Sequence, residues 1–460
     1  MASRPRFFRE GNAPCWTARS GGEQPPSTCD PSTALGRRFA ASGELRRTFP
    51  GATFYAVSAA FFLLGVSLLG CGPGSESPSE HVTVSDSAGV AVWEATSPDD
   101  VWAVSHRVCA TEEWEFPQGS PDAEGTEFFR IVSGFRRANG EVVVADGGNR
   151  LVLVLAGPGR ELLRFGREGE GPGEFQDLSR VFPVGSDGVA GYDARLSRVQ
   201  IFDGGGQLKR TVSAVTEQLG DGGALLVPVG VVGDESLVAH SSFGFPTEGG
   251  AFVPEVDLVL LDATEEVRHR WSVRLDERVA QVRERGMAFH EPLFSRSAFL
   301  HARDDRILIG HGSDDDLRVL DSEGQLQAVV RLPSREEGLP DREIRELLHR
   351  KHGAAIPDQE RRSRVVDSER ELMAHDAPPS TAQAFVAADG RLAVRLWTPP
   401  SSREHRWLLI DPESERAVGW APDASHRLLD VGEDWVLEAA VDSLDVESVR
   451  LMTITTCPEE

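Results

Sequence analysis

The sequence NGEVVVADGGNRLVLVL, residues 139–155, reads as a tight turn, an apolar strand, a second tight turn and a second apolar strand. Asn, Asp and Gly tolerate the positive φ angles of tight hairpin turns, so both turns fit between antiparallel strands. From Leu151 to Leu155 every residue is apolar. A short strand that is apolar at every position is typical of a strand covered on both faces. The stretch therefore predicts sheets that pack against other sheets on either side.

The same turn and strand recur along the chain. The copies lie at residues 139–144, 186–192, 234–238, 304–309, 388–394 and 433–437. A second phrase, an apolar strand that ends in Asp, places Asp203, Asp262 and Asp321 at intervals of 59 residues, and the next Asp of this kind, Asp411, follows after 90. Strands without intervening helices at this period indicate the blades of a propeller. We predict an all-β protein, a six-bladed β-propeller over residues 82–456, with a helical insertion between the fourth and fifth blades.

A family resemblance supports this prediction. Asp146-Gly147-Gly148-Asn149-Arg150-Leu151, followed by the Gly-rich residues 165–175, resembles the NHL-type repeat. More broadly, residues 82–454 resemble a bacterial family of six-bladed β-propeller lipoproteins. The segment Gly171-Pro172-Gly173-Glu174-Phe175 is the sharpest part of the resemblance, and the later repeats match by pattern only. The resemblance implies the fold and little about activity.

The two ends of the repeat region predict how the ring closes. Apolar strands at residues 82–84 and 90–93 precede the first full repeat, and another at residues 446–454 follows the last. Terminal strands that pair within one blade remove exposed sheet edges. Cys109 and Cys457 are the only cysteines after Cys71, and one lies near each end. In an oxidising compartment we predict a disulfide between them; two free buried thiols are the alternative.

The extra chain between the fourth and fifth repeats, residues 340–377, has a helical pattern. Ile344, Leu347 and Leu348 share one helical face, and Asp341 suits an N-cap. A second helical segment, residues 358–373, follows Pro357. We expect a helical hairpin over one rim of the ring, either as a lid over the central channel or packed against a blade edge.

The N-terminal sequence predicts export. An apolar segment at residues 52–69 follows Arg46 and Arg47, and residues 45–70 together resemble a signal peptide. Residues 1–44 precede it as a leader that is non-native or poorly ordered. An uncleaved membrane-spanning anchor is the alternative, because 18 apolar residues just span a bilayer.

The end of the signal segment resembles a bacterial lipobox. Cleavage between Gly70 and Cys71 would leave Cys71 as the lipidated residue, and residues 71–81 form a flexible tether. Gly72 is not the Asp that commonly retains lipoproteins in the inner membrane, so the resemblance implies the outer membrane. We therefore expect a cell-envelope protein that is attached to the membrane through an N-terminal lipid anchor.

The sequence offers no strong reactive motif. G-x-S-x-G, H-E-x-x-H and EF-hand patterns do not occur. Four weaker candidates each have a structural interpretation that we favour over ligand binding. These are the Gly-rich residues 166–173 as a connector between blades, His349 and His352 as solvated helix surface, Asp314-Asp315-Asp316 as a solvated turn, and Asp146 and Asp193 as turn-stabilising residues. We predict no catalytic residue, no cofactor and no metal ligand.

The formal net charge of −25 makes nucleic acid a poor partner. The favoured function is a binding or scaffold module for a protein, peptide or glycan ligand, carried by loops on a rigid ring. The alternative is a metal-dependent hydrolase or lactonase with its site at the central channel. A passive subunit of an envelope complex is a third interpretation. Of these, we favour a protein without enzyme activity over the hydrolase or lactonase.

Overall fold

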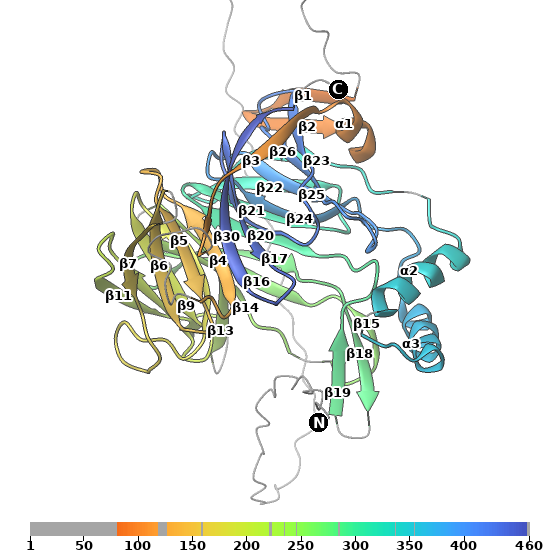
Figure 1. Cartoon of the computed structure of the whole chain (residues 1–460), viewed down its shortest axis with the longest axis horizontal. Coiled ribbons are helices and arrows are strands. Elements are labelled where there is room, and N and C mark those ends of the chain that lie inside the picture. The colour runs from red at the N-terminus through yellow and green to blue at the C-terminus, as the bar shows by residue number, and fades with distance from the viewer. Residues whose placement is uncertain are drawn as a thin grey trace, which may run out of the picture. The chain divides into compact units, whose positions relative to one another are not determined.

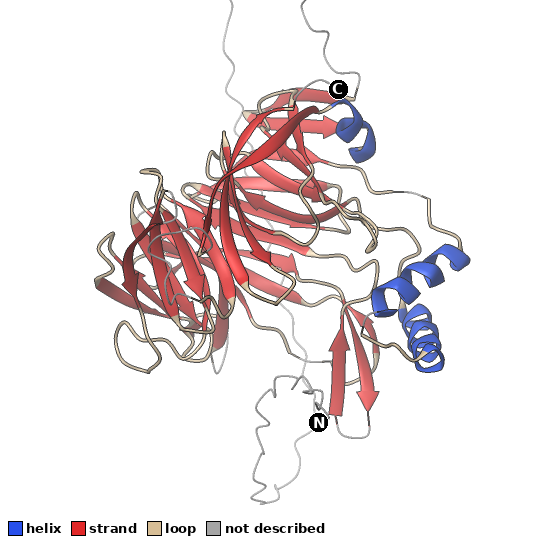
Figure 2. Cartoon of the chain, viewed as in Figure 1, coloured by secondary structure: helices blue, strands red, loops and turns tan. Residues whose placement is uncertain are grey.

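The computed structural model describes most of the chain from residue 81 onward. The described residues are 81–117, 127–157, 160–219, 223–233, 235–244, 246–283, 286–335, 337–353 and 355–457. The predicted leader, signal peptide and tether, with Gly70 and Cys71, lie outside these ranges apart from residue 81. Within them the structure is mainly β, with three α-helices (Figure 2). The prediction of a mainly β protein is confirmed.

Most described strands belong to successive antiparallel units of four strands each (Figure 1). The first unit is β4 (Ile131–Arg136), β5 (Val142–Asp146), β6 (Leu151–Ala156) and β7 (Arg160–Phe165). The second is β8 (Leu178–Val184), β9 (Gly188–Asp193), β10 (Arg198–Phe202) and β11 (Leu208–Ser213). The third is β13 (Ala224–Val232), β14 (Ser236–Ser241), β16 (Glu255–Leu261) and β17 (Val267–Arg274).

The remaining units follow the same order along the chain, with one exception. The fourth is β20 (Ala298–Arg303), β21 (Arg306–His311), β22 (Asp316–Asp321) and β23 (Leu326–Arg331). The fifth is β24 (Thr381–Val386), β25 (Leu392–Leu396), β26 (Arg406–Ile410) and β27 (Ala417–Trp420). The sixth combines β28 (Arg427–Val431), β29 (Trp435–Val441) and β30 (Glu447–Thr456) with β3 (His106–Phe116) from the N-terminal side.

Parallel pairings join some units into larger sheets. β13 meets β20 at Gly230 and Ala302, so the third and fourth units share one sheet. β27 runs parallel to β3 and joins the fifth unit to the sixth. The first and second units are separate sheets, and the sheet orders are open paths without a closing strand pair.

The short elements extend these units. β1 (Val82–Ser87) and β2 (Val90–Ala95) form a hairpin that pairs in parallel with β23. α1 (Pro98–Val104) follows it, and β12 (Val215–Thr216) pairs with β13. β15 (Gly250–Phe252), β18 (Arg278–Arg283) and β19 (Gly286–His290) form a small sheet. α2 (Asp341–Gly353) and α3 (Gln359–Leu372) lie between β23 and β24.

The core consists of apolar clusters between neighbouring units. In β5, Val143 and Ala145 pack toward the second unit, whereas Val142 and Val144 pack against β3, β29 and β30 of the sixth. Successive side chains of a strand point to opposite faces, so one apolar strand supplies two interfaces. All five residues of β5 are consequently buried, as the run of apolar residues predicts.

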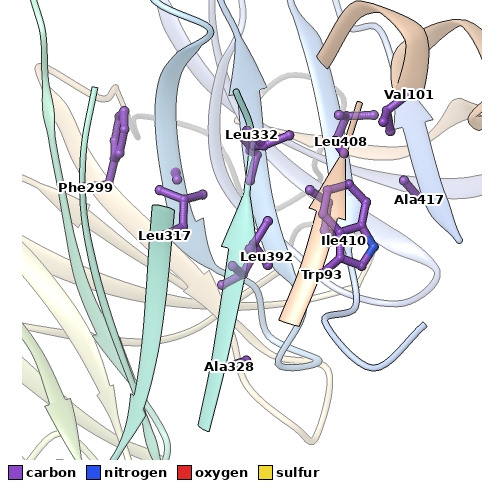
Figure 3. Packing of buried hydrophobic residues seen from close by; sticks show 14 of the residues in the cluster. Trp93, Val101, Phe299, Leu317, Ala328, Leu332, Leu392, Leu408, Ile410 and Ala417 are labelled. Carbon is purple, nitrogen blue, oxygen red and sulfur yellow. The ribbon is translucent and has the colours of Figure 1, made fainter. Parts of the chain in front are cut away.

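Every successive pair of units shares such a cluster. Phe175 belongs to the cluster between units one and two, and Leu226 to the cluster between units two and three. Leu258 belongs to the cluster between units three and four, and Trp407 to the cluster between units five and six. Figure 3 shows the cluster between units four and five, in which Trp93 lies near Ile410 and Phe299 lies at the other side of the cluster. A further cluster around Phe116 and Leu153 joins unit six to unit one.

The pairing of the N-terminal strands corrects one expectation. The strands at residues 82–84 and 90–93 belong to β1 and β2, which extend the fourth unit instead of meeting the C-terminal strand. β3 pairs with β30 instead. The physical reason lies in burial: Trp93 of β2 fits the cluster between units four and five, whereas Trp114 and Phe116 of β3 fit the cluster beside unit one.

The cap of α2 is also corrected. Asp341 is the first helical residue and not the N-cap. Its carboxylate accepts hydrogen bonds from Arg345 and Arg370, at 2.7 and 2.8 Å, so it links α2 to α3. Ile344, Leu347 and Leu348 form the buried face of α2, and Asp358 caps α3.

Candidate functional site

The turns between the first and second strands of five units surround a pocket of about 470 Å³. Residues in or beside each of these turns line it, among them Arg137, Pro183, Asp304, Asp389 and Trp435. Since the lining comes from units one, two, four, five and six, the first strands of these units converge at this pocket. We call it the turn-side pocket.

A buried ion pair adjoins the turn-side pocket. Arg303, which lines the pocket, donates to Asp430 at 2.6 Å, and both side chains are almost fully buried. Asp430 also accepts from the backbone N–H groups of Arg136 and Val431. Burial raises the pKa of Asp430, while the Arg303 charge and these N–H groups oppose the rise. The pair joins the first strands of units four and six to the first unit.

A second group of polar residues, which we call the inner cluster, lies on strands that surround β13: Arg180, His240 and His301. Arg180 is on β8, His240 on β14 and His301 on β20. β13 connects them, because it pairs with β14, contacts β8 and meets β20 at Ala302. The charge of Arg180 contributes to a lowered pKa of both imidazoles, which places Arg180 within electrostatic reach of each of them.

Arg180 has no hydrogen bond or ion pair within the described part of the chain. Its side chain is open to solvent, yet the surrounding protein lowers its pKa by desolvation. A guanidinium without a bonded protein partner keeps its donors available for a ligand.

The two histidines are held in defined protonation states. Burial, aided by the charges of Arg303 and Arg180, lowers the pKa of His301 to about 3. Its Nδ1 accepts the Val386 N–H, so the proton of the neutral ring is on Nε2. His240 has its Nδ1 2.9 Å from the Ser241 carbonyl, which can only accept, so its Nδ1 carries the proton. Desolvation also lowers the pKa of His240.

The lowered pKa of His301 predicts loss of stability in acid. An unfolded histidine titrates near pH 6.5, whereas folded His301 titrates at about 3. Between these values the unfolded chain binds one more proton at this residue, so the free energy of unfolding falls as pH falls, by about 1.4 kcal/mol per pH unit. His301→Gln, in which the amide oxygen can still accept the Val386 N–H, should remove this part of the slope in urea unfolding between pH 6 and 4. His106→Gln, at an exposed position, is the control; equal slopes for the parent protein and H301Q would contradict the assignment.

The structure gives Asp146 and Asp193 structural roles. Both carboxylates are buried. Asp193 accepts the backbone N–H groups of Gln176, Asp177, Arg195 and Leu196. Asp146 makes the equivalent bonds to Phe129, Arg130 and Asn149. Each aspartate ties the turn after the second strand of its unit to the segment that enters the first strand, and its oxygen lone pairs are occupied.

The other weak motifs also have protein partners. His352 contacts the buried carboxylate of Glu369 at 2.6 Å, and Lys351 contacts the same carboxylate at 2.8 Å. In the turn at residues 314–316, the carboxylate of Asp314 accepts a hydrogen bond from Arg274. Asp315 accepts one from the Ser334 hydroxyl, and Asp316 accepts one from Arg331. Within the described residues, no group of three or more His, Cys, Asp or Glu side chains is arranged to hold a metal ion.

The Gly-rich residues 166–173 lie between β7 and β8 and so connect the first two units. The Glu174 carboxylate accepts the Gly171 N–H, and the Gln200 amide oxygen accepts the Gly173 N–H. Arg198 donates to the carbonyls of Gly171 and Glu174. The N–H groups of Gly171 and Gly173 are therefore bound within the protein.

The helices pack on loops and not on the turn-side pocket. Ile344 and Leu348 of α2 and Val366 of α3 bury Phe294, which precedes β20, and contact Trp397, which follows β25. β18 lies beside α3 (Figure 1), and Gln281 of β18 donates a hydrogen bond to Ser368 of α3. These loops are at the strand ends opposite the turn-side pocket. Three helices occur in the described residues, α1, α2 and α3. Each of them is too short or too polar to span a membrane.

Cys109 and Cys457 lie next to each other at the pairing of β3 with β30. Their sulfur atoms are 2.14 Å apart and their Cα atoms 4.9 Å apart. Residues 348 positions apart in the sequence are thereby brought together.

Sequence reasoning missed the inner cluster. A signal existed in one member: His301 interrupts the apolar residues Ala298-Phe299-Leu300 and Ala302 of a strand, and an ionisable residue in a buried strand needs a reason. Nothing in the sequence pairs it with Arg180 or His240, because the three come from different units.

Comparisons with known proteins give remote similarities. No family model and no curated protein matches the chain. A Bacteroides fragilis protein assigned as exported is 11% identical, with 76% of this chain and 95% of that chain covered and a TM-score of 0.41. A DUF4221 member from Bacteroides vulgatus is 11% identical over 76% and 98%, with a TM-score of 0.38. Virginiamycin B lyase from Staphylococcus aureus is 7% identical over 71% and 97%, with a TM-score of 0.34.

Proposed function

We propose that the four-stranded units are the blades of a closed six-bladed β-propeller with NHL-like repeats. The cyclic order of the apolar clusters supports this, since each unit shares a core with two neighbours and the sixth shares one with the first. Phe128, before the first unit, also forms a β-bridge with Glu447 of the sixth. α2 and α3 then form an insertion between the fourth and fifth blades.

We further propose that this propeller is an exported binding module, held at the cell envelope through lipidated Cys71 and facing a protein, peptide or glycan ligand. The observation that carries the proposal is the inner cluster. Arg180, His240 and His301 present a charge, a hydrogen-bond donor and an acceptor, on strands fixed by the surrounding cores. Groups held on rigid strands bind ligands with little loss of conformational entropy.

The test combines metal analysis with ligand binding. We expect purified protein to contain less than about 0.1 equivalent of Ca²⁺ or Zn²⁺ and to melt at the same temperature with and without EDTA, since the proposed site uses no metal. A panel of envelope-type peptides and oligosaccharides should include ligands that raise the melting temperature by mass action. Stoichiometric metal whose removal lowers the melting temperature would instead favour the metal-dependent hydrolase or lactonase. A panel without any stabilising ligand would contradict the binding function.

A further inference from the structure

A second pocket lies where the two longer helices meet the small sheet (Figure 1). α2, α3, the loop between them and the hairpin of β18 and β19 border a space of about 490 Å³, which we call the helix-side pocket. Its lining residues belong neither to the turn-side pocket nor to the inner cluster. We propose that the helix-side pocket binds a small organic carboxylate with an apolar body, a function beyond the binding module proposed above.

One face of α3 forms a wall of the helix-side pocket. Its lining residues have the spacing of one side of a helix: Arg361, Arg364, Val365 and Ser368. Arg364 pairs with the exposed Glu360 at 3.3 Å, whereas the exposed Arg361 side chain makes no hydrogen bond or ion pair among the described residues. Arg361 also lies in the first turn of α3, where the helix dipole disfavours a positive charge. The stability of α3 therefore does not explain an arginine at this position, but contact with an anion does.

A buried carboxylate positions a second cation at this pocket. The Glu369 side chain is only 4% exposed, and it accepts hydrogen bonds from Lys351 Nζ at 2.8 Å and from His352 Nε2 at 2.6 Å. Lys351 also donates to the Glu291 carbonyl oxygen at 2.8 Å. An ammonium group has three N–H donors, so one of those of Lys351 remains for a ligand. Because this ammonium is already held in place, a bound carboxylate loses little conformational entropy in ordering it.

The charges around the helix-side pocket favour an anion. Three cationic side chains line it, those of Lys351, Arg361 and Arg364. Two carboxylates do so as well, Glu291 and Glu369, and the second is already paired with Lys351. The whole chain has 73 acidic and 48 basic residues. An anion that most of this acidic surface repels is therefore attracted to the pocket.

The pocket also offers apolar surface and a size that suits a small molecule. Ile356 and Val365 line it, and the alkyl stems of its lysine and arginines add further apolar surface. Its volume of about 490 Å³ lies within the range of small-molecule sites. A compact apolar body that carries one carboxylate matches both the cations and the apolar side chains.

The experiment compares cinnamate with cinnamamide, its neutral counterpart, and with acetate, which lacks the apolar body. Binding to the full-length protein is measured by ligand-observed NMR at equal ionic strength. We expect cinnamate to bind with a Kd on the order of 1 mM, as suits a ligand of this size, and at least about tenfold more tightly than either of the others. The proposal is overturned if cinnamate does not bind, or if cinnamamide or acetate binds equally well.

Arg361→Gln should weaken cinnamate binding about tenfold, the loss expected for one charge-assisted hydrogen bond, and leave cinnamamide binding unchanged. Arg342→Gln is the matched control, because Arg342 lies on the exposed surface of α2 outside the pocket. This control should bind both probes as the parent protein does. R361Q should melt within about 2 °C of the parent protein, since it loses no bonded partner. A fall of several degrees, or unchanged cinnamate binding, would contradict a binding role for Arg361.

Ile356→Ala tests the apolar part of the helix-side pocket. It should weaken the binding of cinnamate and cinnamamide by the same factor, about threefold, because it removes apolar contact without changing a charge. Unchanged affinities for both probes would place the bound carboxylate outside this pocket and refute the proposal. Since the inner cluster shares none of these residues, failure here would leave the proposed binding function intact.

Discussion

Replacing both Cys109 and Cys457 by Ser will lower the free energy of unfolding by about 4–5 kcal/mol, the scale expected for a cross-link across a very long loop. The two residues are 348 positions apart, so the bond restricts almost the whole described chain in the unfolded state. It also fastens β3 to β30, the pairing that completes the sixth unit with a strand from the N-terminal side. Loss of this pairing would expose two strand edges and separate Trp114 and Phe116 from their cluster.

The measurement is urea unfolding of the parent protein and the double variant, with and without a reducing agent. The reductant should destabilise the parent protein to the level of the variant and leave the variant unchanged. The double substitution avoids a single reactive thiol, which could form bonds between molecules. If the untreated, denatured parent protein titrates two more thiols than the double variant, the cross-link is contradicted and the free-thiol alternative is favoured.

Replacing Gly230 by Ala will cost about 3 kcal/mol, at the upper end for overpacking, because there is no room for a methyl group. A Cβ at this position would lie 1.9 Å from the Ala302 carbonyl oxygen and 2.5 Å from its carbon. These are backbone atoms of β20, so they move only if the strand moves. Gly230 is also the point where β13 meets β20 and the third unit joins the fourth.

Gly244→Ala is the matched control for Gly230→Ala. An added Cβ at Gly244 would meet no heavy atom within 4 Å. Its stability should change by no more than about 0.5 kcal/mol, as for most surface substitutions. Both variants undergo the same loss of backbone freedom in the unfolded state, so the difference between them measures the close approach of the two strands. Equal stabilities of the two variants would be inconsistent with that approach.

Local patterns carried much of the fold. The apolar runs predicted buried strands, and β5 is buried at every residue. Residues 341–353 and 359–372 are helical within the segment predicted to be so. Asp146 and Asp193 were interpreted as turn residues, and their hydrogen bonds agree. These features could be predicted because turn chemistry, helical periodicity and strand burial are encoded within a few neighbouring residues.

Partner choice over long distances could not be predicted in the same way. The sequence contained three N-terminal strands, and the two more apolar ones were expected to meet the C-terminal strand. Charged β3 pairs there instead, because Trp114 and Phe116 fill the space beside the first unit. The strand's sequence specifies two large apolar side chains but not the cavity that accepts them.

The sequence by itself therefore determined where this chain forms strands, tight turns and helices, since local sterics and burial decide these. Only the tertiary structure decided that the charge of Arg180 acts on His240 and His301, that Cys109 lies beside Cys457, and that Gly230 adjoins Ala302. Each of these contacts joins separate segments of the chain. Their proximity depends on how the units stack, which is a property of all the interfaces together.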